Sequence, residues 1–279
     1  MKKKILVTFL FSTALIGIVG CGKAKNLSAD EIINQLEDAE YPIDNVISYT
    51  ETDDPNELLG RPGQYIQKVN FADMRIEQDD TSDPVGGSIE IFENQKDCSE
   101  RQEYLQEVGT SMPEFVEYNY QFDNILIRVS KELEPDQAED YKNAMDAIVN
   151  NEDLGIFSFE DSELTRICVR FNRNLSLDEQ KNIDSAIQSL SGIVDFNYKD
   201  QEALTDEYIA SYYADADEEL REIAKKSALE TGMFNPMYDL TVISGCTETV
   251  KNKMQEISGV EMVDTYKFES ENLETPLIE

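Results

Sequence analysis

Histidine and tryptophan are absent from this sequence, and cysteine occurs only four times in 279 residues. The lack of histidine excludes Ser-His and Cys-His nucleophile pairs, the commonest general base and the usual zinc sites. The lack of tryptophan removes a common sugar-stacking ring, and no two of the many carboxylates stand out as a glycosidase pair. We therefore expect no catalytic residues, no metal site and no cofactor.

Basic residues are also scarce, with 24 Lys and Arg against 58 Asp and Glu, which gives a formal net charge of −34. Such a surface repels nucleic acid and anionic lipid, so we expect no nucleic-acid partner. It favours cationic partners or divalent ions. A simpler interpretation is that the acidic surface keeps an exported protein soluble.

One long apolar run is present, and it lies near the N-terminus. Three lysines follow Met1, and residues 5–19 are almost wholly apolar. The run is too short to span a bilayer comfortably and has the length of a signal-peptide core. It ends in Ile18-Val19-Gly20-Cys21, which resembles the lipobox of bacterial lipoproteins. The alternative is an ordinary signal peptide that a cysteine happens to follow.

The lipobox resemblance implies that residues 1–20 are removed as a signal peptide and that the Cys21 thiol accepts a diacylglycerol group. Residues 21–26 then form a lipidated tether, whose last five residues reach at most about 17 Å when extended. No other apolar stretch approaches the length of a transmembrane helix. We expect a protein held by its lipid anchor at the extracytoplasmic face of the cell membrane.

The other three cysteines, Cys98, Cys168 and Cys246, have no paired or clustered spacing. Their odd number allows at most one disulfide. Cys168 falls in the middle of a predicted strand, whereas Cys246 follows the end of another. We predict that these two thiols do not pair.

Residues 27–150 show a mixed pattern of helices and strands, which predicts an N-terminal α+β domain. Ser28 and Glu31 have the spacing of a capping box at the start of its first helix. Further helices are expected over residues 97–108 and 135–149. Strands are expected over residues 45–50, 64–71, 88–92, 114–120 and 124–129.

One string in this region, Leu58 to Tyr65 (LLGRPGQY), resembles a string in uncharacterised lipoproteins of Gram-positive bacteria. That resemblance implies no activity. Glycine and proline at these positions are typical of a tight turn, so a structural turn is the simpler interpretation.

Residues 156–268 contain an internal repeat. The string IQSLSGI at residues 187–193 is similar to MQEISGV at residues 254–260, and each joins a predicted helix to a predicted strand. Two βαβ halves of this kind predict a second domain with a ferredoxin-like split βαβ sheet and both helices on one face. Residues 201–234, between the halves, are mostly helical and form a long insertion, a feature that is often functional.

The second region resembles the extracellular domain of FtsX, the permease-like cell-division protein. The similarity covers nearly all of residues 164–266, including Ser191-Gly192-Ile193, Asn235-Pro236-Met237 and Ser258-Gly259-Val260. It implies a protein-docking module whose helical lobe recruits or activates a peptidoglycan hydrolase through the hydrolase's coiled coil, in cell division or wall remodelling. FtsX is a membrane permease, and this chain lacks its transmembrane helices, so coupling to an ATPase is not implied.

The resemblance places the partner contacts on the helical lobe. The candidate partner-binding residues are Tyr208, Ile209, Tyr212, Tyr213, Leu220, Ile223, Met233 and Phe234. An exposed aromatic and aliphatic patch is how a groove grips a partner helix. The alternative is that these side chains form the lobe's own core. That alternative is weaker for Tyr212 and Tyr213, because adjacent helical residues point about 100° apart.

A solute- or ion-binding lipoprotein of a transport system is the main alternative function. The acidic runs at residues 79–83 and 215–219 could attract Ca²⁺, although neither has the glycine and ligand pattern of a defined calcium loop. Charge runs are usually solvated faces.

Overall fold

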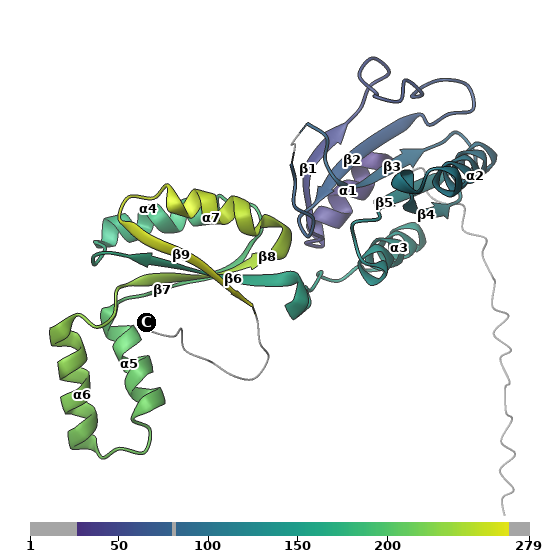
Figure 1. Cartoon of the computed structure of the whole chain (residues 1–279). Coiled ribbons are helices and arrows are strands. Elements are labelled where there is room, and N and C mark those ends of the chain that lie inside the picture. Colours follow the sequence, from purple (N-terminus) through teal and green to yellow (C-terminus); the bar gives the residue numbers. More distant parts are fainter. Residues whose placement is uncertain (1–26, 80–81, 268–279) are drawn as a thin grey trace, which may run out of the picture.

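The computed structural model describes residues 27–79 and 82–267, and the predicted signal peptide, Cys21 and the tether lie outside this range. The described chain forms two antiparallel sheets with helices packed on them (Figure 1). This arrangement confirms the predicted α+β class.

The first sheet has the strand order β1-β2-β3-β5-β4, with every neighbouring pair antiparallel. Its strands are β1 (Ile43–Ser48), β2 (Gln67–Asp73), β3 (Gly86–Ile91), β4 (Glu117–Phe122) and β5 (Ile125–Ser130). Its helices are α1 (Ala29–Asp38), α2 (Gln95–Ser111) and α3 (Pro135–Asn150), with a 3-10 turn, η1, at Pro113–Phe115.

The helices cover both faces of the first sheet, because strand residues alternate between two apolar cores. Ile125, Ile127 and Val129 of β5 pack with α1 and α3, whereas Leu126 packs on the other face with Cys98 of α2. Successive strand residues point to opposite faces, so this alternation follows directly from the strand geometry. The first sheet therefore lies between α1 and α3 on one side and α2 on the other.

The capping box predicted at Ser28 is confirmed. The Ser28 amide donates to Glu31 Oε2 at 2.8 Å, and the Glu31 amide donates to Ser28 Oγ at 3.2 Å. These two bonds satisfy backbone donors that the first turn of α1 would otherwise leave unpaired.

The second sheet has the strand order β7-β8-β6-β9 and is also antiparallel throughout. Its strands are β6 (Leu164–Phe171), β7 (Ile193–Lys199), β8 (Met237–Ile243) and β9 (Val260–Lys267). Helices α4 (Leu177–Gln188) and α7 (Thr247–Gln255) share one core with these strands and lie on one face of the sheet (Figure 1). Two 3-10 turns, η2 (Asp161–Glu163) and η3 (Ser244–Cys246), flank β6 and β8.

The two similar strings of the internal repeat adopt the same turn. Gly192 follows α4 with φ 81° and Gly259 follows α7 with φ 90°. Positive φ is readily available only to glycine, which explains why glycine stands in both copies. The strand predicted to begin at Leu240 is longer in the structure. It is β8, which begins at Met237 because it pairs along its length with both β6 and β7.

The two sheets touch directly through the turn that follows β2. A Cβ added to Gly245 of η3 would lie 2.5 Å from the Met74 carbonyl oxygen, so only glycine fits against this turn. The Phe157 amide, in the connecting segment, donates to the Ala39 carbonyl at 2.7 Å. The connecting segment is thus tied to the end of α1, and the two sheets also approach each other directly.

Candidate functional site

The predicted lobe is a helical hairpin, α5 (Gln201–Tyr212) and α6 (Glu218–Thr231), inserted between β7 and β8. In Figure 1 it projects from the second sheet on the side away from α4 and α7. Local sequence sets its ends: Asp200 Oδ1 accepts from the Ala203 amide at 2.8 Å, and Asp217 Oδ1 accepts from the Leu220 amide at 2.9 Å. Gly232, in the left-handed region, ends α6. Capping carboxylates are favourable at helix N-termini.

Polar contacts hold the two helices of the hairpin together. Lys225 Nζ lies 2.5 Å from Asp206 Oδ1, and Gln201 Nε2 donates to the Leu229 carbonyl at 3.0 Å. Within the hairpin, the buried residues are Thr205, Ile209 and Ala228. None of the three apolar clusters formed by buried residues of the described chain includes a hairpin residue. The hairpin thus has only a small core of its own.

Aromatic rings gather around Tyr208. Its ring centroid lies 5.0 Å from that of Tyr212, 5.9 Å from that of Tyr213 and 5.4 Å from that of Phe234. Burial and the neighbouring Tyr213 hydroxyl raise the pKa of Tyr208. Aromatic pairs prefer such tilted and edge-on arrangements. The structure therefore brings four of the eight predicted contact residues into one cluster.

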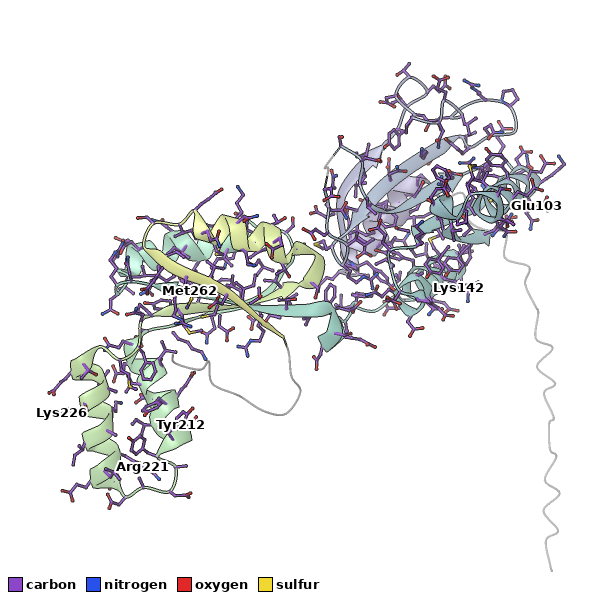
Figure 2. The ribbon with its side chains drawn as sticks, in the orientation of Figure 1. Glu103, Lys142, Tyr212, Arg221, Lys226 and Met262 are labelled. Carbon is purple, nitrogen blue, oxygen red and sulfur yellow. The ribbon has the colours of Figure 1, made fainter. Side chains whose placement is uncertain are left out.

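The eight predicted contact residues differ in exposure. Four are exposed: Tyr212 at 60%, Leu220 at 48%, Ile223 at 59% and Met233 at 45%. Tyr208, Tyr213 and Phe234 are half-buried, and Ile209 is buried. Leu220 and Ile223 stand three residues apart on α6, so they share a face of that helix. Figure 2 shows Tyr212, Arg221 and Lys226 on the hairpin, remote from the core of the second sheet. The burial of Ile209 makes it part of the hairpin's core.

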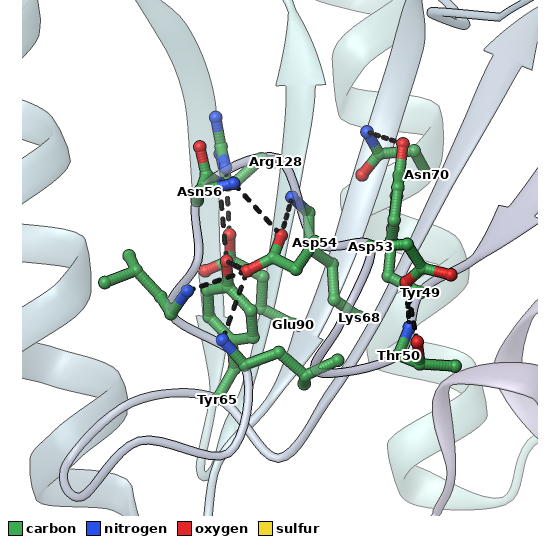
Figure 3. A network of polar contacts seen from close by, with 12 residues as sticks. Tyr49, Thr50, Asp53, Asp54, Asn56, Tyr65, Lys68, Asn70, Glu90 and Arg128 are labelled. Carbon is green, nitrogen blue, oxygen red and sulfur yellow. Dashed lines mark hydrogen bonds and ion pairs between the residues drawn. The ribbon is translucent and has the colours of Figure 1, made fainter.

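A second set of polar residues, not predicted from the sequence, lies on the face of the first sheet that packs with Cys98 of α2, and Figure 3 shows its contacts. Asp54 is buried and accepts from Tyr65 Oη at 2.7 Å and Lys68 Nζ at 2.9 Å. The Leu58 and Leu59 amides donate to the same carboxylate at 2.9 and 3.1 Å. Burial opposes ionisation of Asp54, but these hydrogen bonds outweigh it and hold its pKa well below the usual range.

The network continues across the sheet through a buried carboxylate. Glu90 Oε1 accepts from Arg128 Nη1 at 2.9 Å, and Glu90 Oε2 accepts from Arg101 Nε at 3.1 Å. Every charge in this set has an opposite partner, which is the condition under which charges are tolerated in a core. The only signal in the sequence was the placement of Lys68 and Glu90 within strand-forming stretches.

Asp54 also explains the string from Leu58 to Tyr65. Gly60 and Gly63 have φ of 79° and 75°, and the Gly60 amide donates to the Tyr65 carbonyl at 2.9 Å. With the amides of Leu58 and Leu59 held by Asp54, the string forms a turn against the sheet. This arrangement supports the structural interpretation of the string over a functional one.

The acidic run at residues 215–219 forms the start of a helix. In the run 215–219, Asp217 caps α6 and Glu218 and Glu219 occupy its first turn, while part of the run 79–83 lies outside the described residues. Within residues 27–79 and 82–267, no group of His, Cys, Asp or Glu is arranged to hold a metal ion.

Cys98, Cys168 and Cys246 are free thiols, which confirms that Cys168 and Cys246 do not pair. Burial raises the pKa of the Cys98 thiol to about 12.

A surface hollow of about 520 Å³ lies at the edge strand β4 between Gln102 and Lys142. Gln102 Nε2 donates to the Asn119 carbonyl at 3.0 Å, and Asn119 Nδ2 donates to the Glu117 carbonyl at 3.0 Å. Side chains thus already occupy two backbone acceptors of this edge, a common protection against strand pairing.

Comparison of the chain with protein-family models, curated proteins and solved structures gave no match. Of the helices in the described part of the chain, none has both the length and the apolar character needed to cross a bilayer.

Proposed function

We propose that this protein is a surface lipoprotein, anchored through Cys21 at the extracytoplasmic face of the cell membrane, that docks another envelope protein on its α5–α6 hairpin. The observation that carries the proposal is the apolar surface of the hairpin. Tyr212, Leu220, Ile223 and Met233 are between 45% and 60% exposed on an element with little core of its own. Several exposed apolar side chains on one small element favour an interaction site over singly scattered surface residues.

The proposed partner presents an amphipathic or coiled-coil helix, most simply that of a peptidoglycan hydrolase. The similarity to the FtsX extracellular domain is part of this proposal. Its support is the strand order β7-β8-β6-β9 with α4 and α7 on one face, as a ferredoxin-like split βαβ sheet would require. The hairpin between the two halves then corresponds to the docking lobe of that family.

A two-domain organisation also belongs to the proposal, with residues 27–150 and 156–268 as the domains. Separate apolar cores under the two sheets support it. The first domain would then hold the docking domain near the membrane, because the short predicted tether ends at the start of α1.

The test is affinity capture from envelope extract with the chain from residue 22 onward, followed by measurement of the affinity for the purified captured protein. Tyr212→Ala with Tyr213→Ala should weaken binding by about 2 kcal/mol or more, roughly 30-fold, because aromatic anchors dominate such interfaces. Tyr104→Ala is the matched control, since Tyr104 is 56% exposed on α2 of the first sheet.

The thermal midpoint of each variant separates docking from folding. Loss of binding together with an equally large fall in the midpoint of the double variant would assign the two tyrosines to the hairpin core instead. Full binding by the double variant would remove them from the site. If no envelope protein is captured, the docking function is abandoned in favour of solute binding.

A further inference from the structure

The apolar surface of the hairpin is surrounded by negative charge. Between residues 200 and 234, Asp and Glu outnumber Lys and Arg by ten to three. Glu219 is adjacent to Leu220 and lies one helical turn before Ile223, and Glu222 follows Glu219 by three residues. Residues three and four apart on a helix are neighbours, so these two carboxylates border the stripe formed by Leu220 and Ile223. Both are exposed.

The three basic side chains of the hairpin are already engaged inside it. Lys225 pairs with Asp206, and Lys226 lies 3.8 Å from Glu230. Arg221 Nε donates to the Tyr213 carbonyl at 2.9 Å, and its Nη2 donates to the Ala214 carbonyl. Among the ion pairs of the described chain, none engages Asp215, Glu218 or Glu219. The hairpin therefore presents a negative electrostatic potential to a partner.

We infer that the occupant of this surface is a cationic amphipathic helix, with apolar side chains against Tyr212, Leu220 and Ile223 and with Lys or Arg along its flanks. This inference rests on the proposed docking function and adds the charge of the partner. An anionic helix of the same apolar pattern would bring like charges together at the border of the stripe, which opposes binding and slows association. The same field disfavours an anionic bilayer as the occupant.

The probes are two synthetic helical peptides with the same leucine pattern on one face and either lysine or glutamate on the flanks. Fluorescence anisotropy measures the binding of each to the purified chain from residue 22 onward. The lysine peptide should bind at least about tenfold more tightly at low salt, because complementary charge acts on both association and specificity. This preference should shrink at high salt, since exposed charges are screened.

Two pairs of variants locate the effect. Glu219→Gln with Glu222→Gln should reduce the preference for the lysine peptide about threefold or more. Glu103→Gln with Glu107→Gln is the matched control, because these exposed carboxylates lie on α2 of the first sheet, and it should leave the preference unchanged. Leu220→Ser with Ile223→Ser should weaken binding of the lysine peptide, whereas Leu177→Ser, at a residue 73% exposed on α4, should not.

Equal binding of the two peptides would overturn the inference about charge and leave the docking proposal standing. Failure of both peptides to bind, while the captured partner still requires Tyr212 and Tyr213, would have the same meaning. Tight binding of the lysine peptide to the Leu220→Ser, Ile223→Ser variant would show that charge alone attracts the peptide. The stripe of Leu220 and Ile223 would then not be its binding site, which would overturn the inference.

Discussion

At the scale of single residues, Asp54 combines four close donors with almost complete burial. Lys68 supplies the compensating charge, and Tyr65 and two backbone amides supply further hydrogen bonds. A buried carboxylate with these partners is held ionised, and its partners depend on it in turn, because each would otherwise be a buried donor without an acceptor.

Replacement of Asp54 by Asn should lower the free energy of unfolding by about 3–5 kcal/mol at neutral pH, because it leaves the buried Lys68 without its counter-ion. Urea unfolding measures the change. Glu57→Gln is the control, because Glu57 pairs with Arg61 on the surface and is 83% exposed, and exposed pairs contribute little. A loss no larger than that of the control would contradict the role given to Asp54.

The effect of Asp54→Asn on the free energy of unfolding should depend on pH. A carboxyl whose folded pKa lies below its unfolded value adds stability above the unfolded pKa, and this stability is lost as the pH falls through the folded pKa. The pKa of Asp54 is lowered, so the wild type should lose stability on acidification below about pH 4. The Asn variant should lose less over that range, and parallel curves would show that Asp54 does not contribute.

At the scale of elements, the hairpin is an insertion that the second sheet does not need. Lys199, at the end of β7, is the register partner of Met237, at the start of β8. Two antiparallel strands that meet in this way can be joined by a loop of two to five residues. The 34 residues from Gln201 to Phe234 therefore enter and leave the sheet at neighbouring points.

Replacement of residues 201–234 by two glycines should leave the second sheet folded, because none of the apolar core under that sheet comes from the hairpin. The retained Pro236 still offers its carbonyl to the Phe171 amide, an interaction of 2.9 Å in the intact chain. Thermal unfolding should show a midpoint close to that of the wild type, with binding of the captured partner abolished. A molten or unfolded second sheet would mean that the hairpin is part of its fold.

At the scale of the whole molecule, Arg75 joins the two sheets. Its guanidinium contacts Asp73 Oδ2 at 2.8 Å, Asp140 Oδ2 at 3.0 Å and Glu163 Oε1 at 3.1 Å, and these partners belong to β2, α3 and η2. Phe157, in the connection, lies against the same guanidinium, 5.4 Å from ring centroid to Cζ. One buried cation thus binds carboxylates that precede and follow the connecting segment.

Arg75→Met should destabilise the chain by about 3–5 kcal/mol, because it leaves buried carboxylates without a cation. The substitution should also weaken the association of the two sheets. Limited proteolysis is expected to cut within residues 150–155, most of which are exposed and where we place the domain boundary. The two wild-type fragments should stay together on gel filtration, and those of Arg75→Met should separate. Arg61→Met, at an exposed arginine, is the control. A wild type that resists cleavage would argue against two domains.

Membrane attachment is predicted to depend on one thiol outside the described residues. Cys21→Ser should leave an uncleaved or unlipidated precursor, because no other residue of the lipobox can accept the diacylglycerol group. Metabolic labelling with an acyl probe should mark the wild type alone. Equal labelling of the variant would defeat the lipoprotein assignment.

Local patterns predicted much of the second sheet and the helical character of the insertion. The strand from Leu164 to Phe171, the glycine turns at Gly192 and Gly259 and the helical insertion all depend on neighbouring residues, so they can be read from short stretches. The partners of Arg75 could not be predicted in this way. Asp140 and Glu163 stand 65 and 88 residues away from it, and many other carboxylates in this acidic chain were equal candidates.

The sequence by itself determined the acidic surface, the α+β class, the capped start of α1 and the apolar character of the hairpin, because composition, periodicity and capping act within a few residues. Tertiary structure alone decided that Ile209 is buried while Tyr212 stays exposed, since that choice depends on where α6 packs against α5. It also decided the burial of Asp54 and Glu90. A charge enters a core only where the fold brings its counter-ion, and strand pairing and helix packing determine where Lys68, Arg101 and Arg128 lie.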